Sequence, residues 1–152
     1  MVAPSPQEEG RANVKPDVTY RLTKDFGIPA WIALFKAAAY NRWWTERNAR
    51  AALDYAYVVA TAWNGDAMVG TLTVWSDGVN FAWLDDIVVR PDCRGQGIGT
   101  ALVRQTVARL RADGIRLLQL FPIPGREPFF ARLGFRVQPD AKVMDLVTLK
   151  GA

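Results

Sequence analysis

The chain has 152 residues, half of them apolar and 22% charged, a composition typical of one globular domain. It contains no histidine and one cysteine, Cys93, which excludes histidine-based acid–base catalysis, an internal disulfide and almost every zinc or copper site. The net charge of +4 is modest and the arginines are scattered, so nucleic-acid binding has weak support. No apolar run is long enough to cross a bilayer, and residues 1–10 lack the features of a signal peptide. We therefore expect a cytoplasmic protein with no membrane partner.

The hydrophobic pattern of the first half predicts a strand, two helices and a three-stranded meander. The expected strands cover residues 18–23, 57–63, 68–75 and 80–89, and the expected helices cover residues 28–40 and 46–55. Thr45 is placed to cap the second helix, although Asn48 stands where a capping box usually has glutamate or glutamine. Residues 1–15 are expected to form a flexible tail before a single domain of residues 16–152.

The second half is organised around a strand that leads into a helix. Ile87-Val88-Val89 is typical of a buried strand, which Pro91 ends. Apolar residues recur at helical spacing from Ile98, and Gly114 is expected to end that helix. Beyond it we expect a strand over residues 115–121, a helix over residues 126–133, and strands over residues 135–137 and 143–149. A strand, helix and strand in this order predict a parallel pair.

The segment between this strand and this helix has the properties of a phosphate-binding loop. It reads Arg94, Gly95, Gln96, Gly97, Ile98, Gly99, Thr100. Glycines at a helix start allow backbone N–H groups to approach a ligand, and the unpaired N–H groups of the first turn favour an anion. Arg94 adds a guanidinium able to bind phosphate through two nitrogens. The Walker and dinucleotide-binding patterns are both absent, and a glycine-rich turn without a ligand is the alternative.

Two segments resemble motifs of the GCN5-related N-acetyltransferase (GNAT) family. The residues in register with its motif A are Val89, Pro91, Arg94, Gly97 and Gly99. Phe129-Phe130-Ala131-Arg132-Leu133-Gly134-Phe135 is similar to its motif B and follows in the family's order. The resemblance covers residues 18–149. It implies an α/β (α+β) fold with a mixed central sheet of six to seven strands, antiparallel in its first half, a splayed parallel pair at the cofactor site and about four helices.

The resemblance also implies a site for acetyl-CoA. In this family the pantetheine arm pairs with the backbone of the strand before the glycines, here Ile87, Val88 and Val89, and a bulge commonly exposes such groups. The pyrophosphate would lie on the glycine-rich segment. From motif B, Phe129 and Phe130 would pack along the thioester end or in the core. Arg132 would approach a phosphate or stay exposed to solvent.

Transfer of an acetyl group to an amine needs a base for the incoming ammonium and an acid for the departing thiolate. Asp85 and Asp86 lie on the strand expected to carry the acetyl group, so both are candidates for the base. Because adjacent residues of a regular strand face opposite sides, we expect at most one to point into a given cleft, and we favour Asp86. Attraction of a cationic substrate and proton relay through water are the alternative roles.

The acid is where the chain departs from the family pattern. Phe130 stands where the family usually has a tyrosine, and no tyrosine follows Tyr57. Tyr40 and Tyr57 are the candidates from the first half, with packing as their alternative role, and water or the product ammonium are the other proton sources.

Candidate residues for the acceptor site are Tyr40, Trp43, Trp44 and Trp75. Aromatic side chains beside acidic ones suit a small primary amine with an apolar or aryl part, whereas tryptophans that only fill the core are the alternative.

We therefore expect an enzyme that moves an acetyl group from acetyl-CoA to a primary amine, by direct attack in a ternary complex. One alternative is a sensor module that binds acyl-CoA with little turnover, which Phe130 favours. Another is an acetyltransferase that acts on a protein or a tRNA. Dimers are common among the proteins that the chain resembles, so a homodimer is a further expectation.

Overall fold

The computed structural model describes residues 17–41 and 43–144. The elements in chain order are β1 (Val18–Leu22), α1 (Ile28–Ala37), α2 (Glu46–Tyr55), β2 (Val58–Asn64), β3 (Ala67–Ser76), β4 (Phe81–Val89), the 3-10 helix η1 (Pro91–Cys93), α3 (Ile98–Ala112), β5 (Leu117–Gln119) and α4 (Glu127–Ala131). The chain divides into two compact units, Met1–Phe121 and Pro122–Ala152. In the described residues no helix is both long and apolar enough to span a membrane.

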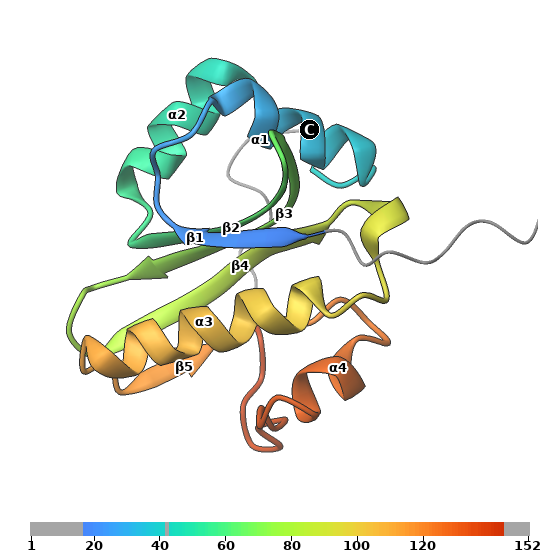
Figure 1. Ribbon diagram of the computed structural model, residues 1–152. Coiled ribbons are helices and arrows are strands. Elements are labelled where there is room, and N and C mark those ends of the chain that lie inside the picture. Colours follow the sequence, from blue (N-terminus) through green and yellow to red (C-terminus); the bar gives the residue numbers. More distant parts are fainter. Residues whose placement is uncertain (1–16, 42, 145–152) are drawn as a thin grey trace, which may run out of the picture. The chain divides into compact units, whose positions relative to one another are not determined.

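The first unit is built on a five-stranded sheet with the order β1-β2-β3-β4-β5 (Figure 1). The first four strands are antiparallel neighbours, and β5 pairs with β4 in the parallel direction that the crossover through α3 predicts. This parallel pairing is confined to residues 81–83 of β4. Among the described residues, no strand therefore lies beside residues 84–89 on that edge of β4.

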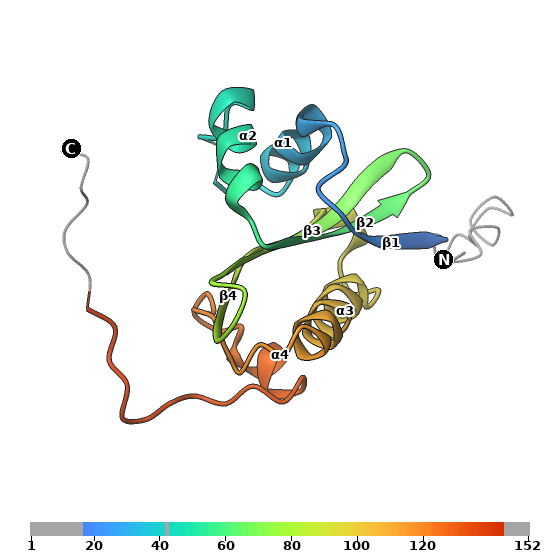
Figure 2. The same cartoon turned by 90° about the vertical axis from the view of Figure 1, so that its left-hand side faces the viewer.

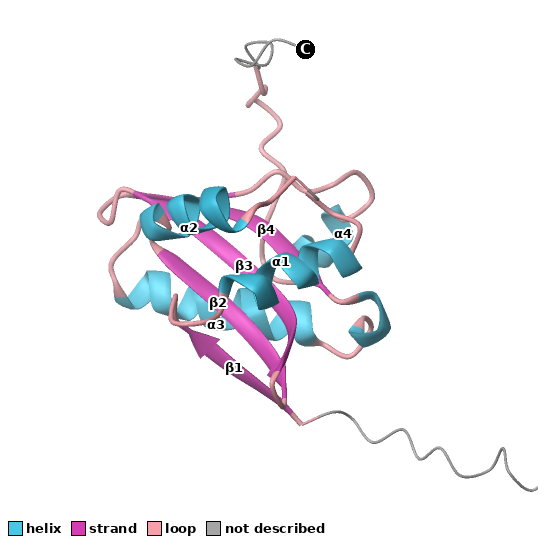
Figure 3. Cartoon of the chain, turned by 90° about the horizontal axis from the view of Figure 1, so that it is seen from above, coloured by secondary structure: helices cyan, strands magenta, loops and turns pink. Residues whose placement is uncertain are grey.

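Helices cover both faces of this sheet. The pair α1 and α2 lies on one face and α3 lies on the other (Figures 2 and 3). The first layer is packed with aromatic and aliphatic side chains, among them Trp31, Phe35 and Leu53 from the helices and Val59 and Val88 from the sheet. β4 therefore has one face toward the α1–α2 layer while its end leads into α3.

Gly70 allows α3 to pack close to the sheet. A Cβ atom at this position of β3 would lie 3.0 Å from Cγ2 of Ile98 and 3.1 Å from Cδ1 of Leu102. Both of these side chains are buried. The missing side chain therefore fixes the height of the first turns of α3 above the sheet, and with it the place of the glycine-rich segment.

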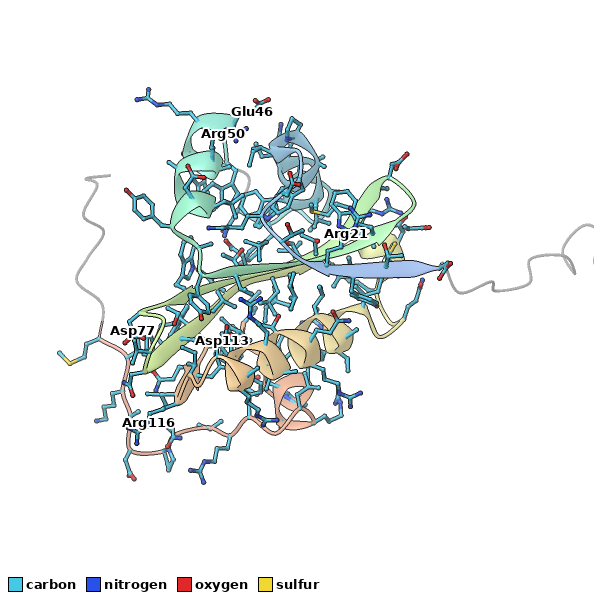
Figure 4. All side chains as sticks on the ribbon, turned by 60° about the vertical axis from the view of Figure 1, so that its left-hand side comes forward. Arg21, Glu46, Arg50, Asp77, Asp113 and Arg116 are labelled. Carbon is cyan, nitrogen blue, oxygen red and sulfur yellow. The ribbon has the colours of Figure 1, made fainter. Side chains whose placement is uncertain are left out.

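Polar side chains define two of the local boundaries. Thr45 Oγ1 accepts a hydrogen bond from the Asn48 N–H, and Asn48 Oδ1 accepts one from the Thr45 N–H, so asparagine completes the capping box. Asp77 Oδ1 accepts from three successive N–H groups in the β3–β4 turn, at 2.8 to 3.0 Å. Figure 4 shows Asp77 at this turn, and Glu46 and Arg50 directed from α2 away from the sheet.

The expected helices and strands up to residue 133 form within a few residues of their predicted ends, whereas the two expected strands beyond it differ. Residues 135–137 form no strand, so that prediction was wrong. Of the strand expected over residues 143–149, residues 143–144 are not in a strand, and residues 145–149 lie outside the described residues. The sheet of the described residues accordingly has five strands where six to seven were expected. A strand needs a neighbour for its hydrogen bonds, and Pro139 removes a donor just after this segment.

Candidate active site

A β-bulge in β4 places Asp86 in an unusual conformation. Thr71 pairs with Val88 and Thr73 pairs with Asp85, so two residues of β4, Asp86 and Ile87, lie opposite one residue of β3. Asp86 has a φ of 48°, in the left-handed region that aspartate tolerates better than most residues. Its side chain is only 6% exposed. The bulge that the family resemblance implied is therefore present.

The bulge brings both aspartates to the face covered by α1 and α2. Asp86 Oδ1 accepts a hydrogen bond of 2.9 Å from Nδ2 of Asn41, in the turn after α1. Asp85 Oδ2 accepts one of 3.1 Å from Nε1 of Trp75, which packs against the same core layer. Both carboxyl groups thus lie on one face of the sheet, because the extra residue interrupts the alternation on which the preference for one of them rested.

Burial and the neighbouring Asp85 together raise the pKa of Asp86 to about 7, while the hydrogen bond from Asn41 acts in the opposite direction. Burial also raises the pKa of Tyr40, and the charges of Asp86 and Asp85 raise it further. Tyr40 thus lies near both carboxyl groups and keeps its phenolic proton. A carboxyl group that titrates near neutral pH is suited to accept a proton.

The glycine-rich segment forms an open helix start. Gly95 and Gly97 have φ values of 75° and 83°, and Gly97 is the N-cap of α3. No atom lies within 4 Å of a Cβ built on either glycine, so the space beside them is open. Ile98 is buried and anchors the first turn of α3, while Arg94 and Gln96 are exposed. The first N–H groups of α3 thus face a site that an anion can approach.

At the end of β4, some backbone N–H and C=O groups point toward the edge of the strand that no described strand covers. The Arg90 N–H donates to the Val69 carbonyl of β3 at 2.9 Å, whereas the Val89 carbonyl accepts from Nε of Arg94 at 3.1 Å. Successive backbone groups of a regular strand alternate in direction, so Val89, beyond the bulge, points its groups to the open edge. The Val88 side chain is buried in the core layer.

The four candidate acceptor residues occupy different environments. Tyr40 and Trp75 are half-buried near the two carboxyl groups. Trp43 is 61% exposed and stacks on Trp44 with ring centroids 4.1 Å apart. Trp44 is itself buried against Trp31 at 5.0 Å, so it is a core residue that supports the exposed ring.

Tyr57 contacts the end of α3 that is opposite the glycine-rich segment. Its hydroxyl donates to Oδ2 of Asp113 at 2.9 Å, at the C-terminal end of α3. The glycine-rich segment lies at the other end of this 15-residue helix, which corresponds to about 22 Å. The hydroxyl of Tyr57 is thus engaged with Asp113, and a role of Tyr57 as the acid stays a prediction.

The candidates from motif B belong to the second unit. Phe130 is buried there, with ring centroids 4.9 Å from Phe129 and 5.8 Å from Phe135. Arg132 is exposed and follows α4 directly. These contacts make Phe130 a packing residue of its own unit, and the role of all three motif residues at a cofactor stays a prediction.

Two residues of this region were not expected from the sequence. Asn41 contacts Asp86 from a segment 45 positions away, and its only sequence signal is an asparagine just after a helix, where left-handed residues are common. Thr73 lies opposite Asp85 and is 1% exposed, and its hydroxyl has no hydrogen-bond partner among the described residues. A threonine within a strand gives no sequence signal that it will lie opposite a candidate site residue.

Comparison with known proteins identifies the family. The model of the acetyltransferase (GNAT) family matches residues 19–135, which is most of the chain. The chain belongs to the GNAT acetyltransferase family. Membership agrees with the fold, because the mixed sheet with its parallel pair and four helices is the α/β arrangement that the motif resemblance implied.

Curated relatives of this GNAT protein are N-acetyltransferases. "Serotonin N-acetyltransferase 2, chloroplastic" from Oryza sativa subsp. japonica is 34% identical over 100 residues, which cover 63% of this chain and 50% of the relative. An uncharacterized N-acetyltransferase, ycf52, from Gracilaria tenuistipitata var. liui is 31% identical over 98 residues, 62% of this chain and 54% of the relative. The chain thus spans about half the length of these curated relatives.

Solved structures with the same fold include acetyltransferases. A GNAT family acetyltransferase from Streptococcus pneumoniae TIGR4 has a TM-score of 0.72 at 22% identity, over 88% of this chain and 99% of the other. An acetyltransferase from Trypanosoma brucei has a TM-score of 0.69 at 21% identity, over 86% of this chain and 100% of the other. At these identities the likeness concerns the fold alone.

Proposed function

We propose that this GNAT protein transfers the acetyl group of acetyl-CoA to a small primary amine, by direct attack while both are bound. The observation that carries the proposal is the continuity of β4 with α3. Within 16 residues this segment holds two adjacent carboxyl groups, of which that of Asp86 is buried, an open strand edge and a glycine-rich helix start. Each of these three features suits one part of such a reaction.

The residues at the helix start fit the diphosphate of coenzyme A. Open space beside Gly95 and Gly97 admits a ligand close to the backbone, and the first N–H groups of α3 are donors for phosphate oxygens. The guanidinium of Arg94 is fixed through its Nε, and its Nη groups form no hydrogen bond with other described residues. The backbone groups along the open edge of β4, which include those of Val89, suit the amides of a pantetheine arm. Acetyl-CoA supplies the acetyl group as a reactive thioester.

Asp86 is assigned the role of base. An amine enters as an ammonium ion, and a buried carboxylate with a pKa of about 7 both attracts it and accepts its proton near neutral pH. Asp85 adds a second negative charge at the same place, held by Trp75. Tyr40 keeps its proton because burial, and then both carboxyl groups, raise its pKa, which makes it the tyrosine that we assign to the acid.

The acceptor is assigned to primary amines with an aromatic part. Trp43 offers an exposed aromatic face, and Tyr40 and Trp75 pack against the core layer beside the carboxyl groups. The relative from rice is named for serotonin, an arylalkylamine, which is consistent with this class. The two carboxyl groups favour a cationic acceptor over an anionic one.

The test is release of free thiol from acetyl-CoA in the presence of 2-phenylethylamine, compared with glucosamine and β-alanine. We expect turnover with 2-phenylethylamine and little with the other two. Trp43→Ala should raise KM for 2-phenylethylamine about tenfold with little change in kcat, since it removes an aromatic contact. Tyr55→Ala, at an 86% exposed residue of α2, is the matched control and should change neither.

Two outcomes of this assay would contradict the proposal. Acetylation of only glucosamine or β-alanine would exclude the aromatic acceptor class. Binding of acetyl-CoA without thiol release across a broad set of amines would favour a sensor module, a reading that Phe130 supports because it carries no hydroxyl.

A further inference from the structure

The strained backbone of this protein is concentrated at one place. In the described residues, the non-glycine residues with positive φ are Ala39 at 54°, Asn41 at 42° and Asp86 at 48°. Asn41 and Asp86 are joined by the hydrogen bond of 2.9 Å, and Ala39 lies two residues before Asn41. Left-handed backbone is unfavourable for residues with a side chain and tends to persist at functional sites.

The end of α1 explains how Asn41 reaches β4. The Ala39 N–H donates to the Lys36 carbonyl, and the Tyr40 N–H donates to the Phe35 carbonyl, each at 3.1 Å. This is the hydrogen-bond pattern of a Schellman motif, with alanine at the position that glycine usually occupies. The turn therefore reverses the chain sharply, and a second left-handed residue, Asn41, directs its amide to the bulge.

The other side of this turn is fixed by aromatic packing. Trp44 returns the chain to the core, where its ring centroid lies 5.0 Å from that of Trp31 and 6.2 Å from that of Phe35. Asn41 is thus held between the end of α1 and a buried tryptophan. Such support keeps a strained side chain in one orientation.

We propose that Asn41 is a positioning residue for Asp86, whose amide holds carboxylate oxygen Oδ1 and leaves Oδ2 to receive the proton of the acceptor ammonium. An amide Nδ2 is a donor only, so it matches the ionised carboxylate, which only accepts. This inference rests on the proposed role of Asp86 as base. It assigns to Asn41 the orientation and the ionisation of that base.

The charges around Asp86 determine what loss of this contact would do. The titratable groups that face it among the described residues are Asp85 on the same strand and Tyr40 in the turn after α1. Burial and Asp85 raise the pKa of Asp86, and Asn41 is the neighbour that lowers it. Without the amide, the pKa of Asp86 would therefore rise further above 7.

A purely structural role of Asn41 in the turn is the competing explanation, and two glycine variants separate it from ours. Asn41→Gly removes the amide but keeps the left-handed backbone, which glycine adopts without strain. Ala39→Gly relieves the same kind of strain two residues earlier and leaves the amide in place. If Asn41 only shapes the turn, the two variants should behave alike.

The test is a pH titration of the aspartate carboxyl carbons by NMR on 13C-labelled protein, with the Asp86 signal assigned through Asp86→Asn. We expect a midpoint of about 7 for Asp86 in the unmodified protein, and one about one pH unit higher in Asn41→Gly. Ala39→Gly should leave the midpoint unchanged. An unchanged midpoint in Asn41→Gly, or an equal rise in both variants, would overturn the proposal.

A kinetic measurement separates this inference from the proposed function. With acetyl-CoA and 2-phenylethylamine, Asn41→Gly should lower kcat/KM about fivefold at pH 7 and recover it at pH 9, because fewer molecules have an ionised base at the lower pH. Ala39→Gly should keep the profile of the unmodified protein. A raised NMR midpoint in a protein that releases no thiol would support the contact and reject the proposed reaction.

Discussion

Asp86 has several properties that are unfavourable for a residue with an ionisable side chain. It is buried, it follows another aspartate, and its left-handed backbone is held in a bulge. Each property costs stability, and the hydrogen bond from Asn41 offsets part of that cost. Residues that reduce stability in this way are common where a protein does chemistry.

This cost predicts how stability depends on pH. Folding raises the pKa of Asp86 from 3.8 to about 7, so between these values the folded state binds more protons than the unfolded state. The contribution of Asp86 to stability therefore falls as the pH rises from about 4 to 7, by about 4 kcal/mol at most. Asp86→Asn keeps the shape and the left-handed backbone but carries no charge.

We therefore expect Asp86→Asn to have the melting temperature of the unmodified protein at pH 4 and a clearly higher one at pH 8. At pH 8 its kcat/KM with 2-phenylethylamine should fall by a factor of about 100 or more relative to the unmodified protein. Asp66→Asn, in the exposed β2–β3 turn, is the control and should alter neither quantity. A difference in melting temperature between Asp86→Asn and the unmodified protein that stays constant from pH 4 to pH 8 would contradict a buried, titrating Asp86.

At the scale of elements, the sequence predicted where helices and strands lie better than it predicted the detail of β4. Periodicity and turn residues located α1, α2, α3 and the meander, because these signals are local. The bulge had no such signal, since aspartate and not glycine occupies its left-handed position. Alternation along β4 therefore separated Asp85 from Asp86, whereas the folded strand brings both to one face.

The contact between α3 and β3 gives a prediction at this scale. Gly70→Val should destabilise the protein by about 1–3 kcal/mol, because its side chain would overlap Ile98 and Leu102 and lift the first turns of α3. Urea unfolding at pH 7 measures this change. Gly27→Val, at an extended residue where a Cβ has its nearest neighbour at 3.9 Å, should cost only a few tenths of a kcal/mol. Equal destabilisation by both substitutions would contradict close packing at Gly70.

At the scale of the whole molecule, the two halves of the candidate site differ in how far sequence reveals them. The proposed phosphate-binding half lies within one short segment, so its glycines and Arg94 can be recognised as a motif. The proposed acid–base half consists of residues from β4 and from the turn after α1. These two segments come together only in the folded chain. No spacing rule connects Asn41 with Asp86, and asparagine after a helix is ordinarily a turn residue.

The C-terminal part shows a second limit of local patterns. Residues 135–137 have the apolar content of a strand, but strands also need a neighbour, and in the described residues this segment has none. Gly134, by contrast, meets a local requirement: with a φ of 92° it closes the turn after α4, where its N–H donates to the Ala131 carbonyl.

The most direct test of the account is calorimetric titration with acetyl-CoA of the unmodified protein, Gly97→Leu and Gly114→Leu. The two glycines have φ values of 83° and 80° at opposite ends of α3, and both have open surroundings, so leucine strains the backbone equally at each. We predict binding by the unmodified protein and by Gly114→Leu, and none by Gly97→Leu. Binding by Gly97→Leu with unchanged affinity, or no binding by the unmodified protein, would contradict the assignment of the glycine-rich segment to the cofactor.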